Sequence, residues 1–307
     1  MSNLHFTGVF PILVTPFTDD EHIDLTSFER VVDFMAQLGV DGVTILGVLG
    51  ESNRLIDAER EALIQTAVAA SDGRIPVVVG TSHPGTHATL RLSKRAEELG
   101  ASAVMVTPSK ENVPNEARIF EYFQRVAAGL TIPIVAQDHP ASTGVHMSSD
   151  LILRLVEAIP HIACIKQEAV PTPPKTRALL AGFSPTRRPT ILTGLGALYG
   201  RYDLESGADG FMTGFAFPEV LQALVTARNA GDDKRLGALY ERFLPLIVFE
   251  QQPGVAVRKE IFRLRGLLQS NCVRHPGRGI DPQTADHLQR LLNSLLPDVD
   301  LTTPLTF

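Results

Sequence analysis

Short apolar runs alternate with longer amphipathic segments along most of this sequence. The first run, residues 8–17 (GVFPILVTPF), has the pattern of a strand, and residues 25–39 (LTSFERVVDFMAQLG) place apolar residues at helical spacing up to Gly39. The alternation continues to about residue 231. It predicts strands at 8–17, 42–47, 75–81, 101–108, 132–138, 161–168, 189–194 and 210–215, and helices at 25–39, 57–71 (capped by Asp57), 86–100, 115–129, 148–159, 175–182, 197–207 and 218–231.

The predicted strands are too uniformly apolar for a sheet with one wet face, so we expect parallel strands buried on both sides. Strand–helix units repeated in this way predict a (β/α)8 TIM barrel over residues 1–230. A doubly wound open sheet is the alternative, but no glycine-rich dinucleotide motif follows the first strand. Apolar periodicity then predicts a C-terminal extension of three helices over residues 231–307, at 232–252, 255–268 and 282–296. Such apolar faces often also build an oligomer interface.

Composition and charge argue against several classes of protein. The 307 residues are 44% hydrophobic and 20% charged, which is enough apolar material for a core. A net charge of −6 without a basic run argues against a nucleic-acid partner. Two cysteines, no signal peptide and no run long enough to span a membrane predict a cytoplasmic protein without disulfides. The nine histidines show no metal-binding spacing, so we expect no metal.

In a barrel of this type, the active site lies at the carboxyl ends of the strands. Lys166 stands at such an end, directly after the apolar residues 162–165. A lysine there can extend its charged end into water or form a structural salt bridge. Alternatively, it is held as a free amine, because burial disfavours its charged form. A free amine attacks a carbonyl carbon and forms an imine, which makes Lys166 a candidate nucleophile.

Two loops at the same end carry further candidates. In residues 46–52 (LGVLGES), two glycines bracket Val48 and Leu49, so exposed backbone N–H groups can hold a carboxylate; the alternative is a simple turn. In residues 137–144 (QDHPASTG), Asp138 and His139 are possible acid–base groups, and the alternative is a turn-capping or solvent-facing role.

Taken together, these segments resemble the dihydrodipicolinate synthase and N-acetylneuraminate lyase superfamily. The resemblance runs over nearly the whole chain and is carried by GVFPILVTPF, GVLGES, DGRIPVVVGTS, VMVTP, PIVAQDHPASTG, IACIKQE and LTG. It implies a barrel with a C-terminal helical extension, usually a tetramer, so we expect a homo-oligomer (dimer or tetramer). It also implies an imine between a 2-oxo acid and Lys166 without any cofactor. Thr193, Gly194 and Met212 match positions that line the family's 2-oxo acid pocket.

The sequence departs from the synthase pattern at the residues that move protons. Val48 and Leu49 replace two hydroxyl residues, although N–H groups centred on Leu49 and Gly50 can still bind a carboxylate. Gln137 replaces the tyrosine at the end of the fifth strand. Because Gln137 cannot ionise, both the synthase condensation and a retro-aldol cleavage that uses this tyrosine are disfavoured.

Two further synthase residues are also replaced. Ser109 or Lys110 stands near the family's second tyrosine, and Ser142 stands where an arginine binds the second substrate. Without the tyrosine, the segment after the fourth strand supplies no phenol for the proton relay of the synthase. Without the arginine, the carboxylate of the second substrate has no cation to bind. These losses argue further against synthase activity.

The segments VAQDHPASTG and RFLPLIVFEQQPGVAVRKEIFRLRG are closer to the 2-keto-3-deoxy-L-arabonate dehydratases. In a dehydratase, the iminium acidifies the C3 proton, and its removal expels the C4 hydroxyl as water. The candidates for this acid–base role are a water held by Gln137, or the side chain of His139, Ser142 or Lys110. The leading hypothesis is therefore a Schiff-base lyase that dehydrates a small 2-keto-3-deoxy sugar acid. The alternatives are an aldolase or synthase of the same class and a non-catalytic barrel that binds a keto acid.

Overall fold

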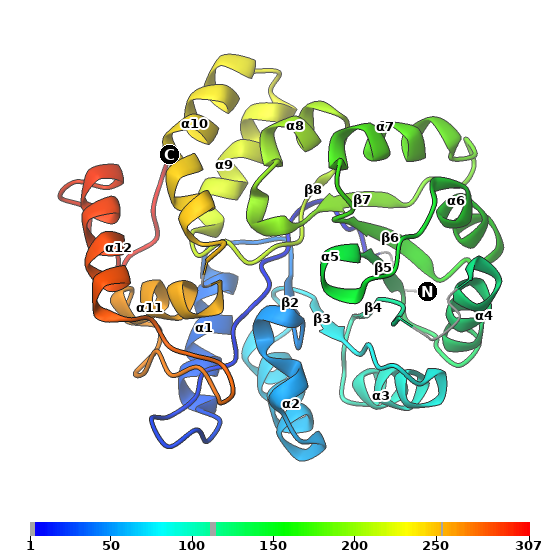
Figure 1. Cartoon of the computed structure of the whole chain (residues 1–307), viewed down its shortest axis with the longest axis horizontal. Helices are drawn as coiled ribbons and strands as arrows, with labels where there is room; N and C mark the ends of the chain where they lie inside the picture. Colours follow the sequence, from blue (N-terminus) through cyan, green and yellow to red (C-terminus); the bar gives the residue numbers. More distant parts are fainter. Residues whose placement is uncertain (1–3, 111–114, 253) are drawn as a thin grey trace.

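The computed structural model describes residues 4–110, 115–252 and 254–307. Within these residues, eight parallel strands form one sheet in the order β1-β8-β7-β6-β5-β4-β3-β2 (Figure 1). The backbone N–H of Thr44 donates to the carbonyl of Pro11, and the backbone carbonyl of Thr44 accepts from the N–H of Leu13. These bonds join the first and last strands of that order and close the barrel. The strands are β1 (Gly8–Val9), β2 (Val43–Ile45), β3 (Val77–Gly80), β4 (Ala103–Val106), β5 (Ile134–Asp138), β6 (Ile162–Gln167), β7 (Thr190–Thr193) and β8 (Gly210–Phe211).

Helices surround the strands, as the apolar periodicity predicted (Figure 1). They are α1 (Leu25–Gln37), α2 (Asp57–Ser71), α3 (Thr86–Glu98), α4 (Glu116–Ala127), α5 (Pro140–Thr143), α6 (Ser149–Ala158), α7 (Thr172–Gly182), α8 (Gly200–Glu205) and α9 (Pro218–Asn229).

Three local predictions were wrong. Asp57 is the first residue of α2, not its cap, and the Glu59 carboxylate instead accepts from the N–H of Ile56. Helix α7 begins at Thr172, inside the proline-rich segment, because prolines fit the first turn of a helix. The short helix α5 was missed, since four residues hold no periodic pattern.

The strands bury side chains on both faces. One apolar cluster fills the inside of the barrel and includes Val78, Met105, Val135, Cys164 and Leu192. A second, larger cluster lies between the strands and the helices. Because the interior is packed, only the two ends of the barrel are open to a ligand.

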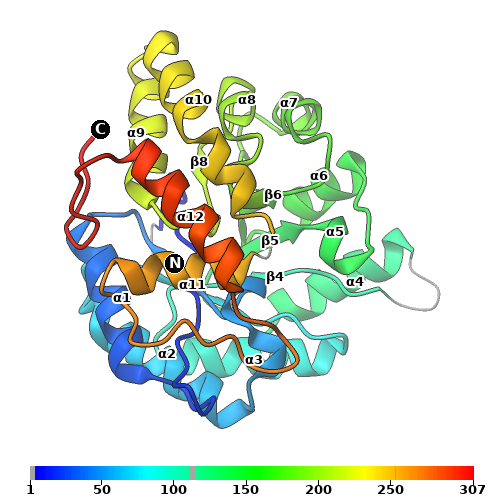
Figure 2. The same ribbon diagram turned by 60° about the vertical axis from the view of Figure 1, so that its left-hand side comes forward.

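Helices α10 (Asp233–Phe249), α11 (Val255–Leu264) and α12 (Pro282–Leu295) lie together at one side of the barrel (Figures 1 and 2). Just after α11, the buried Arg265 pairs with Glu219 of α9 at 2.5 Å and donates to the carbonyl of Ala216 at 3.0 Å. The division of the chain after residue 230 stays a prediction. None of the helices in the described ranges is long and apolar enough to cross a membrane.

Candidate active site

A cavity of about 150 Å³ opens at the carboxyl ends of the strands. This is the volume of about five water molecules, so the cavity suits a small ligand. Its walls come from several βα loops and from the segment that joins α10 to α11. The lining residues are Ile12, Val48, Leu49, Gln137, His139, Lys166, Glu168, Leu195, Gly196, Thr213, Gly214, Gln251 and Arg258.

Lys166 projects from β6 into this cavity and is only 3% exposed. Its Nζ lies 3.1 Å from Oε2 of the buried Glu168. The side chains of a strand alternate in direction, and Cys164 points into the barrel, so Lys166 and then Glu168 follow on the same side. A buried amine and a buried carboxylate thus face each other at the barrel mouth.

Glu168 is held by hydrogen bonds at both oxygens. The amide of Gln137 on β5 donates to Oε2 at 2.7 Å, and the N–H of Leu195 donates to Oε1 at 3.1 Å. Burial raises the pKa of the Glu168 carboxyl, but Lys166, His139 and these hydrogen bonds outweigh burial and hold the pKa below its usual value. Glu168 is therefore a carboxylate at neutral pH.

Space for this carboxylate depends on Gly194, which follows β7. A Cβ at Gly194 would lie 2.1 Å from Glu168 Oε1, far inside van der Waals contact. Gly194 therefore contributes by its lack of a side chain. It does not line the cavity itself.

His139 and Asp138 have different surroundings. His139 lines the cavity, with Nδ1 2.7 Å from the Ser142 hydroxyl and 3.9 Å from Glu168 Oε2. Burial lowers the pKa of His139, so the ring is neutral at pH 7. Asp138 is buried outside the cavity and pairs with Lys175 at 2.5 Å, which fits a structural role.

The loop after β2 forms a 3-10 turn over Val48–Gly50. The N–H of Gly50 donates to the carbonyl of Gly47 at 3.0 Å, so this donor is already paired, contrary to the expectation for Gly50. In the described part of the chain, the N–H groups of Val48 and Leu49 donate no hydrogen bond. Among the N–H groups of this turn, those of Val48 and Leu49 are therefore available to a ligand, and carboxylate binding by the loop stays a prediction.

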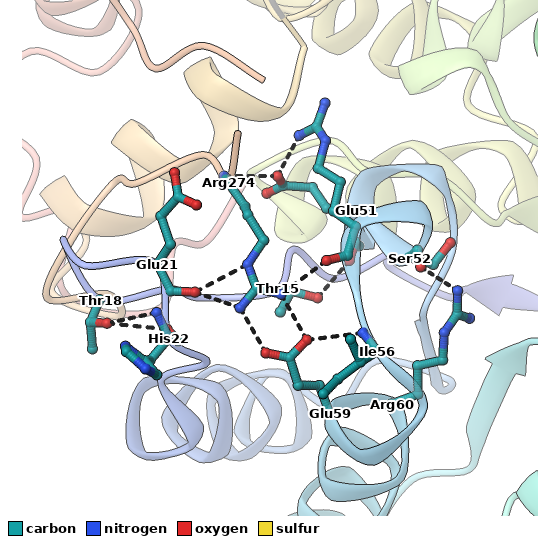
Figure 3. Close-up of polar contacts among 12 residues, drawn as sticks. Thr15, Thr18, Glu21, His22, Glu51, Ser52, Ile56, Glu59, Arg60 and Arg274 are labelled. Carbon is teal, nitrogen blue, oxygen red and sulfur yellow. Dashed lines mark hydrogen bonds and ion pairs between the residues drawn. The ribbon is translucent and has the colours of Figure 1, made fainter. Parts of the chain in front are cut away.

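The C-terminal segment fixes this loop through Glu51. Lys259 on α11 lies 2.5 Å from Glu51 Oε1, and the backbone N–H of Arg274 donates to Oε2 at 3.1 Å. Figure 3 shows Arg274 between Glu21, Glu51 and Glu59, and its guanidinium donates to both oxygens of Glu59 at 2.7 Å. We call Glu51, Lys259 and Arg274 the loop clamp. It connects residues more than 200 positions apart.

Backbone strain also gathers at the cavity. Leu46 and Glu51 in the loop after β2, and Leu195 and Ala197 in the loop after β7, have φ between 50° and 66°. Non-glycine residues adopt this region at a cost and are enriched at functional sites. Both loops touch the cavity, so this strain agrees with a binding role.

The other predicted pocket residues lie outside the cavity lining. Ser142 is exposed, the Thr193 hydroxyl bonds to Asp203, and Met212 belongs to the apolar interior of the barrel. Sequence reasoning missed Glu168, Gln251 and Arg258. The two-residue spacing from Lys166 is a signal that predicts the direction of Glu168. No local pattern marks Gln251 or Arg258.

The model of the dihydrodipicolinate synthetase family matches residues 5–295 of this chain. The chain belongs to this family. It is 36% identical over 296 residues to the L-2-keto-3-deoxyarabonate dehydratase of Azospirillum brasilense, covering 94% of each chain. The crystal structure of dihydrodipicolinate synthase from Rhodopseudomonas palustris is 35% identical, with a TM-score of 0.88, covering 94% of this chain and 97% of the other.

A third relative is YagE from E. coli K12, described as a prophage protein of the dihydrodipicolinic acid synthase family and solved in complex with pyruvate. It is 30% identical, with a TM-score of 0.86, over 94% of this chain and 98% of the other. The family comprises lyases of the class I Schiff-base type, and this chain is accordingly a lyase. The predicted family and enzyme class are thereby confirmed. That the site needs no cofactor stays a prediction; in the described ranges no group of three or more His, Cys, Asp or Glu residues could hold a metal ion.

Proposed function

We propose that this chain dehydrates a small 2-keto-3-deoxy sugar acid through an imine on Lys166. One observation carries the proposal: the Glu168 carboxylate lies 3.1 Å from the Lys166 amine in a buried cavity. Such a carboxylate can exchange protons with the carbon next to the imine. No tyrosine is among the residues that line the described cavity, which favours an acid–base role for Glu168.

The reaction begins when the amine of the Lys166–Glu168 ion pair attacks C2 of the 2-oxo acid. The C2 oxygen takes the proton of the ion pair and one proton from the nitrogen and leaves as water, so the nitrogen keeps one proton. The resulting iminium withdraws electrons from C3, which is two bonds from the nitrogen and within reach of Glu168. Glu168 takes the C3 proton, and the enamine then expels the C4 hydroxyl, which leaves as water with the proton held by Glu168. Water finally hydrolyses the imine, so the net change is the loss of one water from the substrate.

The remaining groups of the site have supporting roles in this proposal. The N–H groups of Val48 and Leu49 bind the substrate carboxylate, and Gln137 holds Glu168 in place at 2.7 Å. His139 stays neutral and borders the space above Glu168. The relative from Azospirillum brasilense bears the name of a dehydratase of this substrate class, which supports the same choice.

The test is borohydride reduction of the protein with pyruvate and with a 3-deoxy-2-oxopentonate, followed by peptide mass spectrometry. We expect a reduced pyruvate adduct on Lys166 and, with the sugar acid, an adduct that has lost one water. A pyruvate-sized adduct from the sugar acid would indicate aldol cleavage instead. No adduct on Lys166 with either compound would leave a barrel that only binds a keto acid.

Two lysine variants test whether trapping occurs at Lys166 and not at other lysines. Lys166→Met should abolish trapping, whereas Lys234→Met, at an exposed position of α10, should trap like the unchanged protein. The predicted homo-oligomer and cytoplasmic location are part of the proposal. Light scattering of the purified protein tests the first, and cell fractionation tests the second.

A further inference from the structure

We infer that Arg258 and Gln251 bind a hydroxyl at the far end of the substrate, opposite its 2-oxo acid group. The inference rests on the proposed function, because it extends the same substrate beyond the reacting carbons. Both residues line the cavity that contains Lys166. Both come from the C-terminal segment: Gln251 follows α10, and Arg258 lies on α11.

Arg258 is a buried cation with donors to spare. It is 5% exposed, and Nε donates to the Glu250 carboxylate at 2.9 Å. Its two terminal nitrogens donate no hydrogen bond to any part of the chain that the structure describes. Arg258 lines the cavity, so these nitrogens can donate to a ligand oxygen there.

Gln251 supplies the complementary group. Its Nε2 donates to the carbonyl of Ile247 at 3.0 Å, which leaves Oε1 as a hydrogen-bond acceptor. Arg258 can only donate, and Gln251 Oε1 can only accept. A hydroxyl satisfies both residues because it accepts from one and donates to the other. A carboxylate has no proton to donate to Gln251 Oε1, so it satisfies only Arg258.

The loop after β7 is shaped to admit these two side chains. A Cβ at Gly196 would lie 2.3 Å from Gln251 Nε2 and 3.0 Å from Arg258 Nη2, so any side chain there would displace them. Lys166 lies on β6, and the loop with Val48 and Leu49 follows β2, four strands away in the barrel order. Arg258 beside the β7 loop therefore gives the cavity a third contact point, separate from those for the carboxylate and for C2.

The test compares two substrates that differ at one atom. A 3-deoxy-2-oxopentonate carries a C5 hydroxyl, whereas 4-hydroxy-2-oxopentanoate keeps the C4 leaving group and lacks that hydroxyl. We expect the unchanged protein to prefer the first compound by about 10- to 100-fold in kcat/KM, the range of a hydrogen bond to a charged group. Arg258→Met and Gln251→Leu should each reduce this preference to about 3-fold or less.

The matched control is Arg263→Met on the same helix, where Arg263 is paired with Glu260 and is not among the residues that line the cavity. It should keep the full preference. Arg258→Met leaves the Glu250 carboxylate buried without its cation. The double variant Arg258→Met with Glu250→Gln removes this unpaired carboxylate as well. Equal use of both compounds by the unchanged protein, or a preference that survives in Gln251→Leu and the double variant, would overturn the inference.

Failure of the proposed function gives a different result. Loss of the pyruvate adduct on Lys166 in the unchanged protein refutes the imine chemistry, whatever the substrate preference. In that case, the ratio of Kd values for the two compounds, measured by calorimetry, answers the question about Arg258. A ratio near 1 rejects the far-end contact, and a ratio of about 10 or more that falls in Gln251→Leu supports it.

Discussion

At the scale of single residues, the site is governed by one buried carboxylate beside one buried amine. Lys166 alone is compatible with a structural salt bridge or with a nucleophile. Glu168 favours the second alternative, because its carboxylate contacts three donors: the Lys166 amine, the Gln137 amide and the N–H of Leu195. These donors keep it ionised without water, which is the state a proton acceptor needs.

Replacing this carboxylate should stop the chemistry at a defined step. We expect Glu168→Gln to lower kcat by about 10²- to 10⁴-fold, the usual contribution of a positioned acid–base group. Borohydride should still trap pyruvate on Lys166, because the amine remains. Steady-state assays and trapping measure the two effects, with the exposed Glu157→Gln on α6 as the control. A variant with unchanged kcat would exclude Glu168 as the proton acceptor.

The lowered pKa of Glu168 also predicts a pH profile. Neighbouring donors hold this pKa below the ordinary value of 4.5. As pH falls through the lowered pKa, the carboxylate gains a proton and can no longer accept one from C3. The acid limb of kcat/KM that comes from this group should therefore lie below about pH 4.5. An acid limb near pH 6 that vanishes in Glu168→Gln would contradict the assignment.

At the scale of elements, the catalytic end of the barrel is completed by α11 and the segment after it. The loop clamp ties the loop after β2 to Lys259 and Arg274. Lys259 is fully buried, and its Nζ also donates to the carbonyl of Cys272 at 2.6 Å. The loop that carries the Val48 and Leu49 donors is therefore held from outside the barrel strands.

Breaking the clamp should affect both stability and binding. Lys259→Met removes one of the two cations that pair with the buried Glu51, and Arg54 remains at 2.5 Å, so we expect a loss of about 2–3 kcal/mol in the free energy of unfolding. The KM for the 2-oxo acid should rise more than kcat falls, because the carboxylate donors lose their support. Urea unfolding and kinetics measure both. Arg263→Met removes a half-exposed cation on the same helix, and Glu260 keeps its hydrogen bond from Asn271, so this variant should cost about 1 kcal/mol or less.

At the scale of the whole molecule, the C-terminal segment is joined to the barrel by buried charges as well as by apolar contact. Arg265 pairs with Glu219 of α9 at 2.5 Å and is 1% exposed, and Lys259 pairs with Glu51. Removing the segment would leave the buried Glu219 without Arg265 and would take Lys259 from Glu51, which keeps Arg54. Buried ion pairs thus cross the predicted boundary at 230 and 231, and the division itself stays a prediction.

Truncation tests this continuity. A chain that ends at residue 231 should lose cooperative thermal unfolding, as followed by circular dichroism, because Glu219 loses Arg265 and Glu51 loses both Lys259 and the N–H of Arg274. The full chain and the Arg263→Met variant are the controls. A soluble truncated barrel with a sharp unfolding transition would instead support two independent domains.

The pH dependence of stability has one identifiable contribution. Burial raises the pKa of Glu250 to about 7, above its ordinary value of 4.5. Between these two values the folded chain binds a proton that the unfolded chain has lost, so the stability from this group is lost as pH rises through about 7. Relative to Glu250→Gln, the unchanged protein should lose up to about 3 kcal/mol between about pH 5 and pH 8 in denaturant unfolding. A difference that stays constant with pH would contradict the raised pKa.

The sequence by itself determined the barrel and the place of Lys166. Both are local properties, because apolar periodicity records which face of each element is buried, and a strand end follows its apolar run. The two-residue spacing of Lys166 and Glu168 was equally local, although it was not used. Only the tertiary structure decided the partners of these groups. Residues 251, 258, 259 and 274 reach the site because α10 and α11 fold back over the barrel mouth, and no pattern along the chain records a contact across 200 residues.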